Sequence, residues 1–333
     1  MRSRVTVFSR HFVFLIAVVT FALSGQAQAQ FNFTSNNGTV TITGYTGSNS
    51  TVVIPGNINF QPVTTIAPGA FESISMTSVT IPGTVTTIGA NAFEDCFLLA
   101  SVTIPANVTS IGAGAFQNCS SLATVTIPAK VTSLGALAFD NCANLTVINV
   151  NASNTAYSSV GGVLFNKNQT TLLEYPSGLA GSYTIPGTVT TVGASAFDSC
   201  TNLTSVTVPA SVTSIGPGAF QSCSSLSAIN VNSGSTAYSS VGGVLFNQSQ
   251  TTLITYPGGL DGSYTIPNGV ISIGDNAFAS SGLTGVTIPN TVTTLGAAAF
   301  ANTNLIGVII PNSVTGWEFI WLGITTMGGM VPV

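Results

Sequence analysis

One 23-residue pattern recurs along most of the chain and constrains its fold more than any other feature. The stretch SVTIPANVTSIGAGAFQNCSSLA, from Ser101 to Ala123, is followed at once by TVTIPAKVTSLGALAFDNCANLT, from Thr124 to Thr146. A repeat of this length predicts a solenoid, in which each coil buries its apolar face only by stacking on its neighbours. The same residues recur because every coil presents them to equivalent coils on either side.

An Ile-Pro or Val-Pro step marks successive coils, at Pro55, Pro82, Pro105, Pro128, Pro186, Pro209, Pro267, Pro289 and Pro311. Two of these intervals are more than twice as long as the rest, because each contains a further strand, INV, at Ile148 and at Ile229. The period therefore continues through both intervals, and the coil that starts at each INV is extended. A three-coil unit follows, with two coils of ordinary length and one extended coil, and YSSVGGVLFN at Tyr157 recurs in the next unit at Tyr238.

Within one coil the pattern predicts a strand, a corner and a returning segment. Val102 and Ile104 alternate with polar residues, as in a strand with one buried face, and Pro105 ends the strand by removing a backbone donor. Apolar residues at helical spacing from Ala115 to Leu122 predict a short helix or 3-10 turn. The predicted core is a ridge of Phe residues with a Cys three positions later in most coils: Phe71, Phe93, Phe116, Phe139, Phe197, Phe220, Phe278, Phe300, Cys96, Cys119, Cys142, Cys200 and Cys223.

Two coils carry an insertion, at about residues 151–181 and 232–262. VLFNKNQTTLLEY and VLFNQSQTTLITY each predict strand, polar turn and strand, which together form a β-hairpin projecting from the solenoid. Their aromatic residues are candidate contacts because exposed aromatic side chains frequently anchor interfaces: Tyr157, Phe165, Tyr175, Tyr238, Phe246 and Tyr256. The alternative is that these rings only pack each hairpin onto its own coil.

The composition restricts the partners. Only 4% of the residues are charged, against about 25% in a typical soluble domain, and Ser, Thr, Asn and Gly take their place. This scarcity of Lys and Arg argues against nucleic acid, which requires several phosphate contacts, and against electrostatic attachment to anionic membranes. The surface is instead wetted by hydroxyl and amide groups.

Residues 1–29 have the organisation of a secretory signal peptide. Arg2, Arg4 and Arg10 precede an apolar run at residues 12–23, and SGQAQAQ supplies a small-x-small cleavage site. We predict cleavage after Ala29, a secreted or cell-surface protein, and no stable membrane insertion once the signal is removed.

The five cysteines occupy the same slot of different coils. Because export favours disulfides, a disulfide framework or a metal site is one interpretation. The other is a row of buried thiols, since equivalent slots of adjacent coils point inward together and free Cys packs as a small hydrophobe. A zinc site lacks a CxxC pair and a histidine outside the signal.

Enzymatic chemistry has little support in the sequence. The one histidine, His11, lies in the signal, so no base is left for a Ser-His-Asp or Cys-His arrangement. The carboxylates Glu94, Asp95, Asp140 and Asp198 are the candidates for a glycosidase pair, and we interpret them as solvated turn residues. We therefore predict a non-enzymatic protein without a cofactor or metal.

A file of hydroxyl groups is the candidate binding face. The outward position of the strand before each Pro is occupied by Thr80, Thr103, Thr126, Thr184, Thr207, Thr265 and Thr287. Three interpretations remain open: β propensity combined with solubility, a weakly charged binding face for protein or glycan, and the ordering of water as in ice-binding solenoids.

These motifs resemble the BspA-type leucine-rich repeat family, also called the Treponema pallidum type. Its pattern L-x-x-V-x-I-P-x-x-V-x-x-I-G-x-x-A-F-x-x-C-x-x-L is matched nearly position for position from Leu122 to Leu145 and from Leu99 to Leu122. The insertion GGVLFNKNQTTLLEYP is similar to the family's D-G-V-L-F-N-K-x-x-T-x-L-x-x-Y-P, with Gly161 and Gly242 in place of the Asp. The resemblance implies a leucine-rich-repeat-like parallel β solenoid and an exported bacterial surface protein, since characterised members are adhesins.

The resulting expectation is a signal peptide at residues 1–29, an N-terminal β cap segment at 30–50, repeats at 51–311 and an atypical tail at 312–333. The expected function is adhesin-like binding to a protein or glycan on another cell or matrix. Alternatives are a structural or extracellular-matrix scaffold without a specific ligand and, more remotely, an ice-binding solenoid. The tail is either a cap for the open end or a truncated coil.

Overall fold

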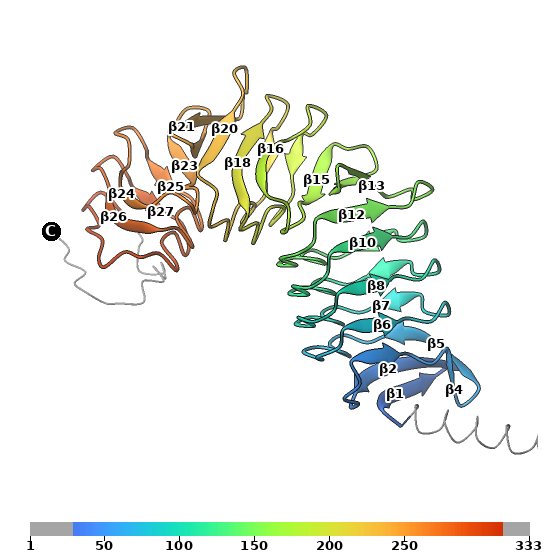
Figure 1. The fold of residues 1–333 in the computed structure, drawn as a ribbon. Coiled ribbons are helices and arrows are strands. Elements are labelled where there is room, and N and C mark those ends of the chain that lie inside the picture. Colours follow the sequence, from blue (N-terminus) through green and yellow to red (C-terminus); the bar gives the residue numbers. More distant parts are fainter. Residues whose placement is uncertain (1–28, 316–333) are drawn as a thin grey trace, which may run out of the picture.

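Residues 29–315, the part of the chain that the computed structural model describes, form coils stacked along an arc (Figure 1). About 11 coils run from β1 (Phe31–Asn36) and β2 (Thr39–Tyr45) at one end to β26 (Leu283–Thr287) and β27 (Thr294–Leu295) at the other. The predicted parallel β solenoid of 23-residue coils is therefore confirmed. Residues 1–28 of the predicted signal peptide and most of the C-terminal tail lie outside the described residues.

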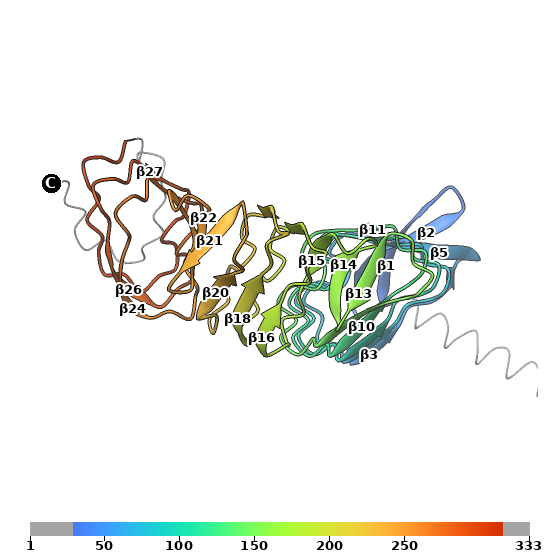
Figure 2. The same cartoon turned by 90° about the horizontal axis from the view of Figure 1, so that it is seen from above.

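Strands of the coils gather on two opposite sides of the arc, with β10, β16 and β18 on one side and β11, β15 and β27 on the other (Figure 2). The first sheet face contains β3 (Thr51–Val53), β6 (Ser78–Thr80), β8 (Ser101–Thr103), β10 (Thr124–Ile127), β12 (Val147–Val150), β16 (Gly181–Thr184), β18 (Leu203–Val208), β20 (Ala228–Val231), β24 (Gly262–Thr265) and β26. The second sheet face contains β2, β5 (Gln61–Ile66), β7 (Thr87–Ile88), β9 (Ser110–Ile111), β11 (Ser133–Leu134), β15 (Thr171–Glu174), β17 (Thr191–Val192), β19 (Ser214–Ile215), β23 (Thr252–Thr255), β25 (Ser272–Ile273) and β27. The remaining strands are β1, β4 (Asn57–Ile58), β13 (Tyr157–Val160), β14 (Val163–Asn166), β21 (Tyr238–Val241) and β22 (Val244–Asn247).

Strands of equivalent coils pair in parallel and keep the repeat in register. In β6 and β8, Val79 lies opposite Val102 and Thr80 opposite Thr103. Because side chains alternate between the faces of a strand, this register sets each inward Val over another Val and each outward Thr beside another Thr. The repeat in the sequence thus becomes files of identical side chains in space.

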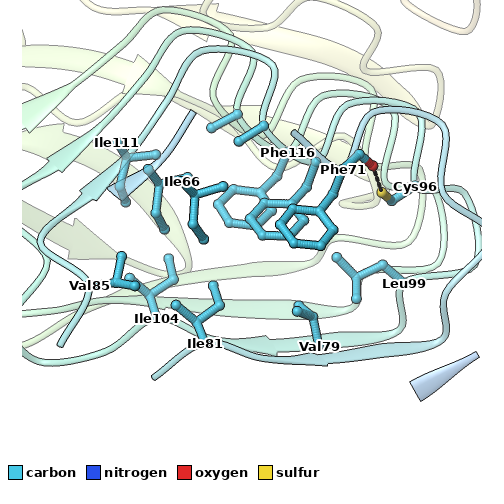
Figure 3. Close-up of a cluster of buried hydrophobic side chains, with 14 of the residues drawn as sticks. Ile66, Phe71, Val79, Ile81, Val85, Cys96, Leu99, Ile104, Ile111 and Phe116 are labelled. Carbon is cyan, nitrogen blue, oxygen red and sulfur yellow. Dashed lines mark hydrogen bonds between the residues drawn. The ribbon is translucent and has the colours of Figure 1, made fainter. Parts of the chain in front are cut away.

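The core between the two sheet faces contains a column of Phe rings. Centroids of the Phe71 and Phe93 rings lie 5.1 Å apart, those of Phe93 and Phe116 also 5.1 Å, and those of Phe116 and Phe139 5.5 Å, all nearly parallel. Figure 3 shows Phe71 and Phe116 in this column, with Val79, Ile81 and Leu99 on the side of the first sheet face. All eight predicted Phe residues are buried: Phe71, Phe93, Phe116, Phe139, Phe197, Phe220, Phe278 and Phe300.

The predicted short helices are wrong, since the described residues contain none. The returning segment is a series of turns in which residues four apart have positive φ, for example Gly114 at 61° and Asn118 at 60°. Alternate backbone N–H groups then point along the solenoid, so that the Phe116 N–H donates to the Ala138 carbonyl at 2.8 Å. A helix would have satisfied these groups within one coil, whereas the turns use them to join coils.

The Gly that precedes the returning segment is required by close packing between coils. A Cβ atom at Gly135 would lie 2.1 Å from the Ala113 backbone nitrogen, and one at Gly112 would lie 2.3 Å from that of Ala90. Neither residue has positive φ. These glycines therefore set how closely successive coils approach.

The hairpins do not project from the solenoid, contrary to the sequence prediction. β14 pairs antiparallel with β13 and with β15, and β15 then pairs in parallel with β17 of the next coil. Val163, Leu164 and Phe165 of β14 are all buried. Each hairpin is a component of the solenoid wall, because its apolar residues occupy the interior that the neighbouring coils leave open.

Each hairpin also interrupts both sheet faces. The second face ends at β11 and resumes at β15, and the first face ends at β12 and resumes at β16. The same break recurs one three-coil unit later, between β19 and β23 and between β20 and β24. We call the two breaks the first and second joint; they divide the arc into three blocks, which correspond to three hydrophobic clusters.

The stacked column predicts that a central Phe contributes more stability than one near the end. We expect Phe116→Ala to lower the free energy of unfolding by about 3–5 kcal/mol, because it removes stacking on both sides and leaves a cavity. Phe300→Ala should cost less, since Phe300 stacks on Phe278 alone among the described residues. Urea titrations of both variants would measure this difference, and equal losses would contradict it.

Candidate binding surfaces

The outward residues of the first sheet face form the hydroxyl file that the sequence predicts. In register, Thr80 lies opposite Thr103, Thr184 opposite Thr207, and Thr265 opposite Thr287. Thr207 is half-buried and the others are exposed; the exposed set is Thr80, Thr103, Thr126, Thr184, Thr265 and Thr287. Paired strands lie about 4.8 Å apart, so these hydroxyl groups form regularly spaced rows of donors and acceptors.

Two amides extend the file beyond the Thr residues that the sequence pattern indicates. Asn149 in β12 lies opposite Thr126, and Asn230 in β20 lies opposite Thr207. Both Asn residues could have been found from the sequence, because each is the central residue of an INV triplet and takes the outward position of its strand. The file ends in apolar residues, with Val53 62% exposed in the first of these coils and Ile309 66% exposed in the last.

The file is discontinuous. Its strands belong to separate hydrogen-bonded sheets, β3–β6–β8, β10–β12, β16–β18–β20 and β24–β26. A flat, unbroken lattice, which an ice-binding face requires, is therefore not present on this surface. Short rows of uncharged hydrogen-bonding groups suit a partner that contacts each row separately.

Most of the candidate hairpin contacts lie inside the molecule. The rings of Phe165, Tyr175, Phe246 and Tyr256 are buried, so they do not present a surface to a partner. Tyr175 occupies the Phe slot of its coil, because its N–H donates to the Ala196 carbonyl at 2.7 Å and its ring lies 5.1 Å from that of Phe197. The alternative interpretation, that the rings pack each hairpin onto its coil, describes these four.

Tyr157 and Tyr238 are half-buried and close the broken sheets. The Tyr157 hydroxyl accepts a hydrogen bond from the Leu134 N–H at 3.0 Å, and that of Tyr238 accepts one from the Ile215 N–H at 2.9 Å. Each hydroxyl takes the place of the carbonyl that the next strand would have supplied. Both side chains are thus used within the fold.

Each joint holds a cleft of about 290 Å³ between consecutive coils. The first joint lines its cleft with three carboxyl groups, Asp140, Glu174 and Asp198. At the matching positions of the next three-coil unit, the second joint has Gln221, Thr255 and Ala279. The two clefts therefore have similar size, but the second is lined by one carboxyl group, Asp275, where the first is lined by three.

The carboxyl groups of the first joint are poorly solvated, contrary to the expectation that Asp140 and Asp198 are solvated turn residues. Asp140 is 8% exposed and its Oδ2 accepts a hydrogen bond from Gln117 Nε2 at 2.9 Å, while Glu174 Oε1 accepts one from the Phe139 N–H at 3.1 Å. Burial, followed by the charge of Asp140, raises the pKa of Glu174 to about 8 and that of Asp198 to about 6. Burial also raises the pKa of Asp140.

The five cysteines are free and buried, which favours the buried thiols over a disulfide framework. Each thiol donates to the carbonyl of the aromatic residue in the preceding coil, for example Cys96 Sγ to Phe71 O at 3.1 Å (Figure 3) and Cys223 Sγ to Phe197 O at 2.9 Å. Residues 29–315 contain no group of three His, Cys, Asp or Glu side chains placed to hold a metal ion. Over the same residues no helix has the length and apolar character to cross a bilayer.

Comparison with known proteins gives one family and several solved structures. The model of the BspA type leucine-rich repeat region matches in six copies, over residues 45–171, 177–262 and 261–318. A leucine-rich repeat protein from Eubacterium ventriosum is 25% identical, with a TM-score of 0.51; the match covers 84% of this chain and 88% of that protein's chain. A leucine-rich cell surface protein from Faecalibacterium prausnitzii is 29% identical, with a TM-score of 0.43; the match covers 90% of this chain and 97% of that protein's chain. No curated protein matches the chain.

The first joint should make stability depend on pH. Because the pKa of Glu174 rises from 4.5 to about 8 on folding, the unfolded chain loses this proton first as the pH rises. The contribution of this carboxyl group to stability should therefore be fully present below about pH 4.5 and be lost as the pH approaches 8. We expect Glu174→Gln, which keeps an acceptor for the Phe139 N–H, to reduce this fall in urea titrations over that range.

A converse variant serves as the control for the pH effect. Thr255→Glu places a carboxyl in the second cleft and should steepen the fall. Identical pH profiles for the wild type and Glu174→Gln would show that this carboxyl is not the cause.

The cysteine row predicts thiols that react only after unfolding. Burial raises the pKa of Cys96 to about 12, so the reactive thiolate is scarce in the folded state. A thiol-specific reagent such as DTNB should label none of the five cysteines in the native protein and all five in denaturant. Rapid labelling of any cysteine under native conditions would contradict this.

Proposed function

This chain belongs to the family of BspA-type leucine-rich repeat proteins, and we propose that it is an exported surface protein that binds a macromolecule through its first sheet face. The signal-like segment at residues 1–29 supports export, and the family resemblance supports an adhesin-like role. The partner is a protein or glycan on another cell or matrix. The carrying observation is the exposed file of Thr and Asn side chains in register along that face.

The chemistry of the file favours a neutral, polar partner. Thr hydroxyls and Asn amides both donate and accept hydrogen bonds, whereas the face offers almost no charge for electrostatic attraction. The rows are fixed by strand pairing, so that little side-chain or backbone freedom is lost on binding. Sugar hydroxyls and the backbone or amide groups of an extended protein segment match such rows.

The hairpin aromatics, which the sequence pattern marks as candidate contacts, contribute little to this proposal. Four of their six rings are buried, and the two half-buried tyrosines already use their hydroxyls within the fold. A scaffold role without a specific ligand is the second candidate. It is favoured by the discontinuity of the file, because short rows give a single partner few simultaneous contacts.

A binding screen with matched surface variants tests the first proposal. The mature protein, residues 30–333, would be immobilised and exposed to matrix proteins, glycans and whole cells. We expect saturable binding to at least one of them. The double variant Thr103→Lys, Thr126→Lys should weaken this binding at least about tenfold, because two long charged side chains then block the rows and lack partners.

The matched control carries the same substitutions on the opposite face. Thr109 and Thr132 are exposed in the same two coils but flank the second sheet face, so Thr109→Lys, Thr132→Lys should bind as the wild type does. Equal loss in both double variants, or in neither, would refute the assignment of the face. No saturable binding to any probe would favour the scaffold role.

A further inference from the structure

The cleft of the first joint, beside β13 and β15 (Figure 1), contains acidic groups without a counter-charge. Its lining includes the carboxyl groups of Asp140, Glu174 and Asp198. Lys130 and Lys167 are the only Lys or Arg residues among residues 29–315, and neither lines the cleft. Each donates instead to an Asn oxygen, at 2.9 Å and 2.6 Å respectively. Because a poorly solvated carboxylate is stabilised by a nearby positive charge, the cleft favours a cation from outside this part of the chain.

One hydroxyl group in the same cleft also lacks a partner. Ser177 lines the cleft and is only 2% exposed, and its hydroxyl makes no hydrogen bond with any residue that the structure describes. Buried hydroxyl groups are almost always hydrogen-bonded, because they have lost their contact with bulk water. The Ser177 oxygen can accept a hydrogen bond from a donor that enters the cleft. The cleft therefore offers acidic acceptors and a neutral acceptor to the same ligand.

The second joint shows that the fold does not require these groups. Its strands are paired in the same order, with the hairpin and the breaks at matching positions. Gly258 stands at the position of Ser177, and the positions of the three carboxyl groups are uncharged. Asp275, the one carboxyl group in its lining, is exposed and accepts a hydrogen bond from the Ala297 N–H at 2.7 Å. The acidic residues and Ser177 of the first joint thus have no structural role that the second joint shares.

The remaining lining of the first cleft limits the class of ligand. Leu134, Leu164 and Leu173 provide an apolar wall, and the cleft volume of about 290 Å³ lies near the lower end of small-molecule sites, roughly 300–1,000 Å³. An alkyl chain that ends in an ammonium group matches this combination, because its methylene groups contact the Leu side chains while three N–H donors reach separate oxygen atoms. A metal ion fits less well, because no three His, Cys, Asp or Glu side chains within residues 29–315 are placed to hold one.

We propose that the first cleft binds a primary alkylammonium group, with Asp140, Glu174 and Asp198 balancing its charge and the Ser177 hydroxyl accepting one of its hydrogen bonds. A free amine and the side chain of a lysine in another protein share this chemistry. No residue of the first sheet face lines the cleft, so this inference does not rest on the proposed function.

Isothermal titration calorimetry with pentylamine tests the proposal. At a pH of about 8 this amine is cationic, as a lysine side chain is, and the Glu174 carboxyl is partly ionised because its pKa is about 8. We expect one saturable site per chain for pentylamine and none for pentanol, which has the same alkyl chain without the charge. Equal binding of both compounds, or of neither, would overturn the proposal.

Two variants of the cleft test which residues bind the amine. The double variant Glu174→Gln, Asp198→Asn should weaken binding at least about tenfold, because it leaves a single carboxyl group. Ser177→Ala should weaken it about threefold without changing the charge, since it removes one hydrogen bond to a neutral acceptor. Circular dichroism and urea titration would show that these variants are folded.

The matched control is Asp275→Asn, which removes the carboxyl group of the second cleft and should bind pentylamine as the wild type does. Unchanged affinity in the double variant would place the amine elsewhere and overturn the proposal. An equal loss in Asp275→Asn would also overturn it, because the loss would then follow the net charge of the protein.

A lysine derivative identifies the source of the amine. Nα-acetyl-lysine methylamide carries the same ammonium group on an amino-acid backbone. If it binds as tightly as pentylamine, the site accepts a lysine side chain of another protein. If it binds at least about tenfold more weakly, the site is restricted to free amines. Both outcomes support an ammonium site in the first cleft, and they differ only in the molecule that supplies the ammonium group.

Discussion

The hydrogen bond from the N–H of the Phe slot to the carbonyl of the next coil is the interaction on which the rest of the structure depends. It is made at 2.8 Å by Phe71, Phe93, Phe116, Phe197 and Phe278. Because it fixes the position of the Phe backbone relative to the coil above, it also fixes the distance between rings at about one strand spacing. The Gly that allows close approach and the Cys thiol that donates to the Phe carbonyl follow from the same spacing.

The first joint shows what happens when this bond is replaced. At the first joint the Phe139 N–H donates to the Glu174 side chain instead of to a carbonyl, and the Phe column stops. The column resumes with Tyr175, whose N–H again donates to the next coil, to Ala196. The space created by the missing contact is the cleft. Hairpin, broken sheets and cleft are therefore consequences of one interruption, which is why all three recur together one three-coil unit later.

Features set by the local pattern were predictable from the sequence, whereas those set by contacts between coils were not. The alternation around Val102 and Thr103 correctly indicates which side chain faces inward, because strand geometry alone decides it. The spacing from Ala115 to Leu122 led to the wrong prediction of a helix, because the same spacing also fits a series of turns. These turns depend on positive φ at Gly114 and Asn118, and a single Gly or Asn in a sequence is too common to predict that. The cleft was hidden because Asp140, Glu174 and Asp198 are brought together only by stacking across the hairpin.

The scarcity of charge limits how this surface can recognise a partner. A charged surface can gain affinity from long-range attraction and from a few ion pairs, but here most of the specificity must come from the positions of hydrogen-bonding groups. A single exposed hydrogen bond contributes little net free energy, because it replaces one made to water. Affinity then requires several groups held at fixed spacing on a rigid support. Strand pairing between coils supplies that support within each sheet, and the interruptions between sheets limit how many groups one partner can engage at the same time.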